Sequence, residues 1–313
     1  MLAASAAVVA AAVVQVPERA ARPQPFTAAP AVLEPTTPAP AARPSTARPS
    51  TVRPPSARRR TAPPVEAALG PPPGPQVDAR PARTAAPTDR YALVIGVTAY
   101  RAPTHRTIAG AQDARLVASM LLQAGWLPGN IRVLTDEQAT GQAVRAGLAW
   151  IAARGVTGTF SYVHFSGHVK QAGGHEKLWP VDRDFVPDTE VAAQLHRVAG
   201  HLWLDVAGCE AAGFIEDLPS DRVLVSTSSR ATQKSYEYPE WGESVWTGLV
   251  YDLGTRQGDA DADHDGSTTV GEALRYATYY AQSVTLTQRP YGRQTPQVAG
   301  DPVRGWTLAD PPA

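Results

Sequence analysis

The chain has 313 residues, a single cysteine and a formal net charge of +0. One cysteine excludes an intramolecular disulfide, and we expect no nucleic-acid partner. The charges are unevenly distributed, because residues 1–90 carry 11 Arg and no Lys against 5 acidic side chains, which leaves the rest of the chain with a net charge of −6. Of the 30 prolines, 19 also fall in residues 1–90. The composition therefore separates a basic, proline-rich part from a net-acidic part that is long enough for one domain with a substantial core.

Residues 1–20 begin with the apolar run MLAASAAVVAAAVVQV. Its length is typical of a signal-peptide core and is too short for an ordinary membrane span. We expect a signal-like or anchor segment here, so that the protein is exported or tethered to a membrane with its folded domain outside. A cytoplasmic protein with an Ala-rich, disordered tail is the alternative. Residues 21–88 are rich in Pro, Ala and Arg and are predicted to be a disordered linker.

The net-acidic part begins with an apolar run at residues 91–97, which predicts a strand buried on both faces of a sheet. Helical and extended patterns alternate beyond it. Helices are predicted at residues 110–124, 140–154, 189–199, 244–253 and 270–281, and strands at residues 131–134, 159–165, 201–206 and 222–226. This alternation predicts a three-layer α/β domain, in which a mainly parallel central sheet lies between helices. Such sheets bind ligands beyond the carboxyl ends of their strands.

Two of the predicted strands end close to residues that carry chemistry. His168 follows the strand SYVHF and the small pair Ser166-Gly167, and Cys209 follows the strand LWLDV and the small pair Ala207-Gly208. If the two strands are neighbours, both side chains reach the same edge of the sheet, where a histidine can deprotonate a thiol or stabilise its thiolate. A lone buried cysteine and a lone histidine are each more often structural, so the prediction depends on their joint placement at strand ends.

Several blocks of the sequence resemble, in order, the caspase-like cysteine peptidases, including metacaspases and their bacterial relatives. The blocks lie between about residues 91 and 302 and comprise YALVIGVTAY, GAQDARLVASMLLQAGW, IRVLTDEQAT, the FSGH block and the block around the cysteine. The resemblance implies a caspase-like domain over residues 89–310 and a cysteine endopeptidase that acts on protein or peptide substrates without an organic cofactor. It matches His168 with the catalytic base and Cys209 with the nucleophile. The natural substrate and the oligomeric state stay open.

In the implied mechanism, the Cys209 thiolate attacks a peptide carbonyl and forms a thioester. His168 delivers a proton to the leaving amine and then activates water for deacylation. The resemblance also implies that the main-chain N–H groups of Cys209 and Val169 hold the oxyanion. The family usually has Gly after the histidine and an acidic or amide side chain two residues before the cysteine, where this chain has Val169 and Ala207.

The residue before the scissile bond needs a pocket, for which Asp205 is a candidate. Side chains of a strand repeat every two residues, so Asp205, Ala207 and Cys209 can share one face. Asp205 is predicted either as an acidic pocket floor that favours Arg or Lys in the substrate, or as a structural carboxylate. Asp182, in a segment that resembles the family, and Ser228, after the next strand, are further candidates for the cleft. The alternative for both is an ordinary polar loop residue.

Residues 261–272, DADHDGSTTVGE, fit the twelve-residue calcium loop of an EF-hand, with a glycine at position six and predicted helices on both sides. The spacing predicts a Ca²⁺ site with a structural or helix-positioning role, and the alternative is an acidic turn without a metal. The predicted ligands are Asp261, Asp263, Asp265, the carbonyl of Ser267, Thr269 and Glu272.

Two other functions stay open. A catalytically inactive caspase-like module could use the cleft or the calcium loop for recognition, since Val169 and Ala207 depart from the family pattern. An α/β serine hydrolase that uses Ser166 is disfavoured, because Ser166 does not lie in a G-x-S-x-G sequence.

Overall fold

The computed structural model describes residues 89–216, 218, 222–287, 292–300 and 305–310. The predicted signal-like segment at residues 1–20 and the predicted linker at residues 21–88 lie outside these ranges. Among the described helices, none combines the length and the hydrophobicity that a membrane span requires.

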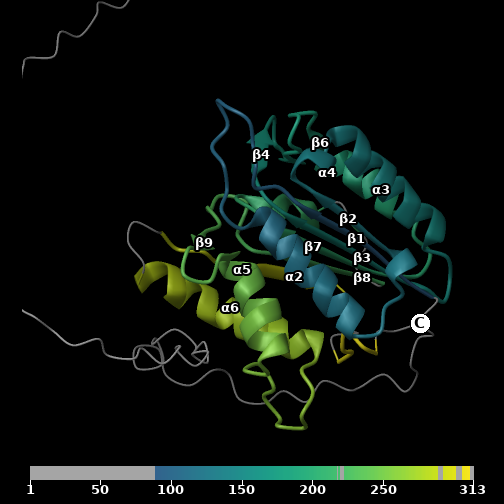
Figure 1. Cartoon of the computed structure of the whole chain (residues 1–313), viewed down its shortest axis with the longest axis vertical. Coiled ribbons are helices and arrows are strands. Elements are labelled where there is room, and N and C mark those ends of the chain that lie inside the picture. The colour runs from purple at the N-terminus through teal and green to yellow at the C-terminus, as the bar shows by residue number, and fades with distance from the viewer. Residues whose placement is uncertain (1–88, 217, 219–221, 288–291, 301–304, 311–313) are drawn as a thin grey trace, which may run out of the picture. The chain divides into compact units, whose positions relative to one another are not determined.

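A six-stranded sheet forms the centre of the domain, with the strand order β11-β8-β7-β3-β1-β2 (Figure 1). All its pairs are parallel except β8 with β11, so the predicted mainly parallel sheet is confirmed. The strands are β1 (Arg90–Gly96), β2 (Ile131–Thr135), β3 (Phe160–Ser166), β7 (His201–Ala207), β8 (Val223–Thr227) and β11 (Gln297–Gly300). Sequence patterns do not indicate β11, because its four half-buried residues are too few to establish a period.

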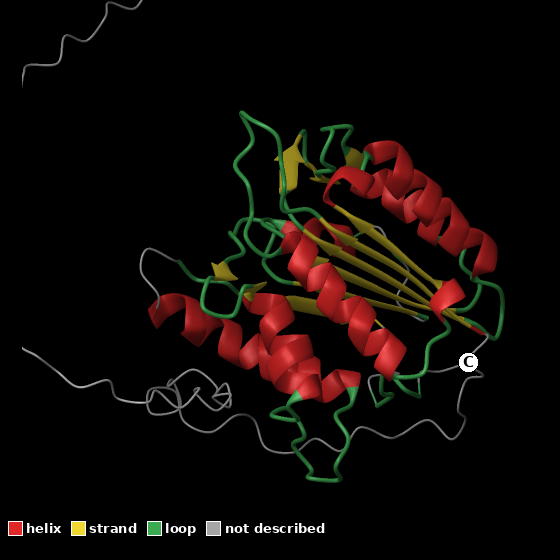
Figure 2. Cartoon of the chain, in the orientation of Figure 1, coloured by secondary structure: helices red, strands yellow, loops and turns green. Residues whose placement is uncertain are grey.

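Helices cover both faces of this sheet (Figure 1, Figure 2). On one face lie α2 (Gly110–Gln123), α5 (Val245–Thr247) with its π-helical continuation η5 (Gly248–Arg256), and α6 (Val270–Thr287); on the other lie α3 (Gly141–Arg154) and α4 (Asp188–Leu195). Two small sheets lie outside the central one, and they comprise β4 (Val169–Ala172), β5 (His175–Leu178) and β6 (Val186–Pro187), and β9 (Glu237–Tyr238) with β10 (Glu243–Ser244). Short helices η2 (Pro128–Asn130), η3 (Asp136–Gln138) and η4 (Ala211–Ile215) occur in the connections.

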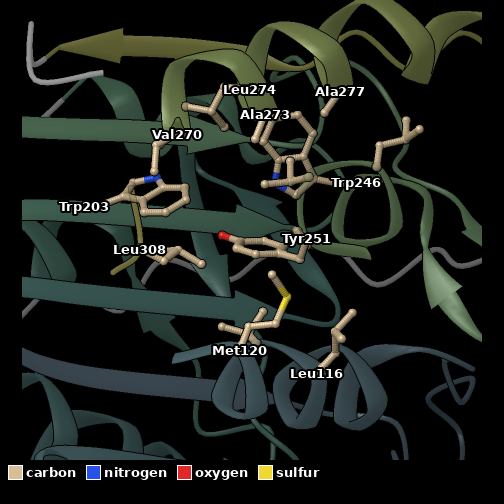
Figure 3. Packing of buried hydrophobic residues seen from close by; sticks show 14 of the residues in the cluster. Leu116, Met120, Trp203, Trp246, Tyr251, Val270, Ala273, Leu274, Ala277 and Leu308 are labelled. Carbon is tan, nitrogen blue, oxygen red and sulfur yellow. The ribbon is translucent and has the colours of Figure 1, made fainter. Parts of the chain in front are cut away.

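The two layers of helices explain why the predicted strands are apolar throughout. In β1, Ala92 and Val94 pack into the cluster under α2, η5 and α6, whereas Leu93 and Ile95 pack into the cluster under α3 and α4. Successive side chains point to opposite faces, so a strand covered on both faces needs apolar residues at every position. Figure 3 shows the first cluster, in which Met120 of α2 lies close to Tyr251 of η5.

The register of β3 and β7 positions the candidate catalytic residues. The two strands are parallel neighbours, and Ser166 at the end of β3 stands opposite Ala207 at the end of β7. The main-chain N–H of Gly167 donates to the carbonyl of Ala207 at 3.1 Å, which ties the two strand ends together. The two strands are therefore neighbours, which is the condition that the sequence prediction left open, and the chain reaches His168 and Cys209 at one edge of the sheet.

Candidate active site

A cavity of about 240 Å³ lies at the carboxyl edge of the sheet and is called the active-site cavity below. Residues 166–168 after β3, residues 207–209 after β7 and residues 235–237 at the start of β9 line it, together with Thr107, Ile108 and Ser244. His168 and Cys209 therefore face one common space. This edge is where parallel α/β sheets bind their ligands.

The imidazole of His168 is held by a main-chain carbonyl. Its Nε2 lies 2.7 Å from the carbonyl oxygen of His105. A carbonyl oxygen can only accept, so Nε2 carries the proton and Nδ1 is left as the nitrogen that can take one. Burial lowers the pKa of His168 below its usual range. The imidazole is therefore neutral near neutral pH, which is the form that a general base requires.

Tyr100 positions this histidine from two directions. Its hydroxyl accepts the main-chain N–H of His168 and donates to the carbonyl of Trp179, each at 2.9 Å. Its ring lies against the imidazole, with 4.5 Å between the ring centroids. A Cβ at Gly167 would lie 2.6 Å from the Tyr100 hydroxyl oxygen, so only glycine fits there. Sequence reasoning did not identify Tyr100, because an aromatic residue after a strand is not by itself a functional signal.

The thiol of Cys209 is half-buried and lies beside the chain at Ser235. Its Sγ is 3.7 Å from the carbonyl oxygen of Ser235, and the N–H of Ser235 approaches Sγ to 3.4 Å. Burial raises the pKa of the Cys209 thiol. The resting cysteine is therefore protonated near neutral pH and needs a base to become a nucleophile.

Two main-chain N–H groups at the strand ends are directed away from the ladders. Trp179 donates its N–H to the carbonyl of His168, which is the pattern of a non-hydrogen-bonded pair at Val169 and Leu178. The N–H of Val169 therefore does not point at β5. Within the described residues, the N–H of Cys209 has no hydrogen-bond acceptor. Both groups that the family resemblance assigns to the oxyanion are thus available as donors.

Ser228 holds the turn that carries Cys209. Its side chain is fully buried, and its hydroxyl accepts from the N–H of Gly208 and donates to the carbonyl of Gly208, each at 2.9 Å. The Ser229 hydroxyl donates to the same carbonyl. Ser228, which was predicted to line the cleft, therefore supports Gly208, the residue before Cys209. It does not line the active-site cavity.

Asp205 is enclosed in the core below the cavity. Its fully buried carboxylate accepts from Ser226 Oγ at 2.5 Å, Trp246 Nε1 at 2.8 Å and Tyr251 OH at 2.7 Å. The fourth partner is Nδ1 of His164 at 2.9 Å. This placement fits a structural carboxylate, which was the alternative to a pocket floor. Of Asp205 and Ala207, only Ala207 lines the cavity.

One other carboxylate lines the active-site cavity, and a second is buried behind its wall. Glu237 lines the cavity and accepts from the N–H groups of Ile108 and Ala109. Asp113, fully buried in α2, accepts from Ser166 Oγ at 2.6 Å and from the N–H of Ser244 at 3.1 Å. Burial raises the pKa of both carboxyl groups. Sequence reasoning missed both, because Asp113 reads as a helix residue and Glu237 lies in an irregular segment.

Asp182 lies outside the active-site cavity and caps a helix. Its exposed carboxylate accepts the N–H of Gly141 at 3.0 Å, at the first residue of α3. The position suits the positive end of the helix dipole. This is the loop-carboxylate alternative of the sequence prediction.

The predicted calcium loop connects η5 to α6. Oxygen atoms of Asp261, Asp263 and Asp265 all lie within 4.8 Å of one another. Gly266, at position six, has φ +86°, a conformation that favours glycine. Glu272 accepts from the N–H and the hydroxyl of Thr269, and Thr269 Oγ1 accepts from the N–H of Glu272. These bonds form a reciprocal cap for α6. Ser267 donates its N–H to Asp265.

The sequence and the fold were compared with those of known proteins. The model of the caspase domain family matches residues 89–286. The fold is similar to that of protein GSU0716 from Geobacter sulfurreducens, a crystal structure, with a TM-score of 0.50 and 14% sequence identity over 68% of this chain and 94% of that chain. At this identity the likeness concerns the fold alone. No curated protein matches the sequence.

Proposed function

Because the chain belongs to the caspase domain family, we propose that it is a cysteine endopeptidase with Cys209 as nucleophile and His168 as general base. One observation carries the proposal. Both side chains line the same cavity at the carboxyl edge of the sheet, and the His105 carbonyl fixes the imidazole with its Nδ1 free to take a proton. A cysteine and a histidine that served only the fold would not need a shared, accessible cavity.

The proposed reaction follows from the protonation states of the two groups. His168 accepts the Cys209 proton, and the thiolate sulfur attacks the carbonyl carbon of the scissile bond. The negative charge moves to the carbonyl oxygen, where the N–H groups of Cys209 and Val169 stabilise it. The C–N bond then breaks, and His168 returns its proton to the leaving amine. Water, deprotonated by His168, hydrolyses the thioester and restores the thiol.

We further propose that the residue before the scissile bond is Arg or Lys. The support is Glu237 in the wall of the active-site cavity, with Asp113 buried behind the wall residues Ser166 and Ser244. Burial disfavours the charged form of both carboxyl groups, so a bound guanidinium or ammonium group would favour their ionisation and gain a charge-assisted contact with Glu237. The acidic side chain in the wall thus comes from β9, and not from Asp205.

Fluorogenic peptides that differ only in the residue before the scissile bond test this proposal. We expect wild type to cleave Arg and Lys peptides, and Cys209→Ala to cleave none. Glu237→Gln is expected to lower kcat/KM for the Arg peptide on the order of tenfold, with a smaller effect on a Leu peptide. If wild type cleaves nothing and a peptidyl thiol reagent labels Cys209 no faster than in unfolded protein, the inactive-module alternative replaces the peptidase.

We also propose that residues 261–272 bind Ca²⁺ through Asp261, Asp263, Asp265, Ser267, Thr269 and Glu272. The clustered aspartate oxygens and the glycine at position six support this proposal. Binding requires the Glu272 carboxylate to exchange its bonds to Thr269 and to the N–H of Ala262 for the ion. Because α6 begins at Val270, within the loop, we propose a role in holding α6 against η5. Measuring thermal unfolding at increasing Ca²⁺ concentrations tests this proposal.

A further inference from the structure

A second cavity lies on the other side of the catalytic histidine. It has a volume of about 460 Å³, and its walls include Lys170, Trp179, Arg183 and Phe185; it is called the basic cavity below. Among the described residues, His168 alone lines both this cavity and the active-site cavity. Cys209 lines only the latter, so the imidazole separates the basic cavity from the thiol.

The chemistry of the proposed reaction decides which part of a substrate lies there. His168 must deliver its proton to the nitrogen of the scissile bond, so this nitrogen and the residue that carries it lie on the imidazole side of the thiol. The residues before the scissile bond lie on the opposite side, along the active-site cavity and residues 235–237. The basic cavity is therefore the first space that the residues after the scissile bond meet.

The walls of this space are cationic and aromatic. Lys170 and Arg183 are exposed, and the Lys170 ammonium lies 4.9 Å from the ring centroid of Phe185 and 5.9 Å from that of Trp179. The aromatic rings fix the position of the ammonium group without neutralising it. Arg183 donates through Nε to the neutral hydroxyl of Thr104. No carboxylate is among the described residues that line the cavity.

The two carboxylates that flank Arg183 in the sequence bond to other groups. Asp182 accepts the N–H of Gly141, and Asp184 accepts from the guanidinium of Arg145. The wall thus offers positive charge to an oxygen-rich group.

From this arrangement we infer that the basic cavity is a specificity site for an acidic side chain, Glu or Asp, directly after the scissile bond. The inference rests on the proposed endopeptidase function and adds the substrate residue that this function leaves open. Lys170 and Arg183 attract the carboxylate, and the rings of Trp179 and Phe185 pack against its methylene groups. Substrates that combine a basic residue before the bond with an acidic one after it match both cavities.

The test uses internally quenched peptides with Arg before the scissile bond and Glu, Gln or Lys after it. For wild type we expect kcat/KM to fall in the order Glu, Gln, Lys, with a difference between Glu and Lys on the order of tenfold. The difference between the Glu and Lys peptides should shrink in about 0.5 M salt, where the Debye length is about 4 Å, because Lys170 and Arg183 are exposed to solvent. Equal rates for the three peptides would overturn the inference.

Charge variants provide the sharper comparison. Lys170→Glu is expected to reverse the order so that the Lys peptide is cleaved fastest, and Arg183→Gln to reduce the preference for Glu. Arg197→Gln removes one exposed positive charge from the connection between α4 and β7, away from the cavity walls, and should leave the order unchanged. A Lys170→Glu variant that keeps the wild-type order would also overturn the inference.

Two controls separate this inference from the proposed function. An Arg-aminocoumarin peptide has no amino acid after the scissile bond, so its cleavage reports peptidase activity alone. Cleavage of the coumarin without a preference among the quenched peptides would leave the peptidase standing and remove the acidic site. If no peptide is cleaved, fluorescence anisotropy can measure the binding of the Glu and Lys peptides to the Cys209→Ala variant. Tighter binding of the Glu peptide would support the inference, and equal binding would overturn it.

Discussion

The side chain of Val169 occupies the space that a side chain at residue 208 would need. A Cβ at Gly208 would lie 2.5 Å from Cγ2 of Val169. Val169 is 7% exposed and packs into the cluster under α3 and α4. The residue after His168 and the residue before Cys209 thus compete directly for the same volume. A valine at the first position is compatible with the active-site edge because the second is glycine.

This relationship predicts a coupled pair of substitutions. Gly208→Ala should destabilise the domain by about 1–3 kcal/mol, because the methyl group overpacks against Val169, and should lower kcat/KM by displacing Cys209. Val169→Gly removes the obstructing side chain, so the double variant should recover part of the stability and activity lost in Gly208→Ala. Thermal unfolding and peptide cleavage across the four proteins measure the coupling. Strictly additive effects would show that the two residues do not interfere.

Tyr100→Phe tests whether Tyr100 positions His168, the proposed general base. The variant keeps the ring against the imidazole but removes the hydroxyl that connects the His168 N–H to the Trp179 carbonyl. We expect kcat to fall about tenfold with little change in KM, because the histidine is misplaced while the substrate cavity is intact. Tyr91→Phe is the matched control, since Tyr91 lies on β1 against Trp150 and does not line the active-site cavity. Equal effects of the two variants would contradict a positioning role for Tyr100.

The pH dependence of thiol alkylation follows from the directions of the pKa shifts. Burial raises the pKa of Cys209 and lowers that of His168, so the free protein holds a neutral thiol and a neutral imidazole rather than an ion pair. Iodoacetamide should therefore modify Cys209 slowly at neutral pH. The rate should rise only at a pH above the usual pKa of an unperturbed cysteine. Activity should persist as the pH falls through the usual histidine range, because His168 stays unprotonated there. A fast alkylation plateau in mildly acidic solution would instead indicate a resting thiolate–imidazolium pair.

Asp205→Asn distinguishes a structural from a substrate-binding carboxylate. The buried carboxylate has four partners, so we expect a loss of about 3 kcal/mol and a fall in Tm of roughly 10 °C. The relative kcat/KM for Arg and Leu peptides should not change, in contrast to Glu237→Gln. A change of this ratio in Asp205→Asn without a change in Tm would assign the pocket to Asp205 after all.

Calcium removal is expected to destabilise the protein. At a Ca²⁺ concentration of about 100 times Kd, binding contributes about 2.7 kcal/mol. Chelation should therefore lower Tm by roughly 5–10 °C. Asp263→Asn with Asp265→Asn should abolish the difference, whereas Asp259→Asn, which lies before the loop, should retain it. An identical Tm with calcium and with chelator in the wild-type protein would exclude the site.

The sequence by itself predicted the main strands and helices in chain order and the mainly parallel sheet, and it placed His168 and Cys209 just after two strands. These features follow from local patterns, because apolar runs, helical spacing and small residues after strands are properties of contiguous residues. Whether the strands before His168 and Cys209 are neighbours was decided by the tertiary structure. The tertiary structure also decided which carboxylates face the active-site cavity. Asp205 has the spacing of a cavity residue but is enclosed by Ser226, Trp246 and Tyr251, which come from distant parts of the chain. Glu237 lines the cavity, and Asp113 accepts from Ser166 in its wall, only because β9 and α2 pack beside the same sheet edge. Burial and charge at a point depend on every element that folds around it, and no local pattern contains that information.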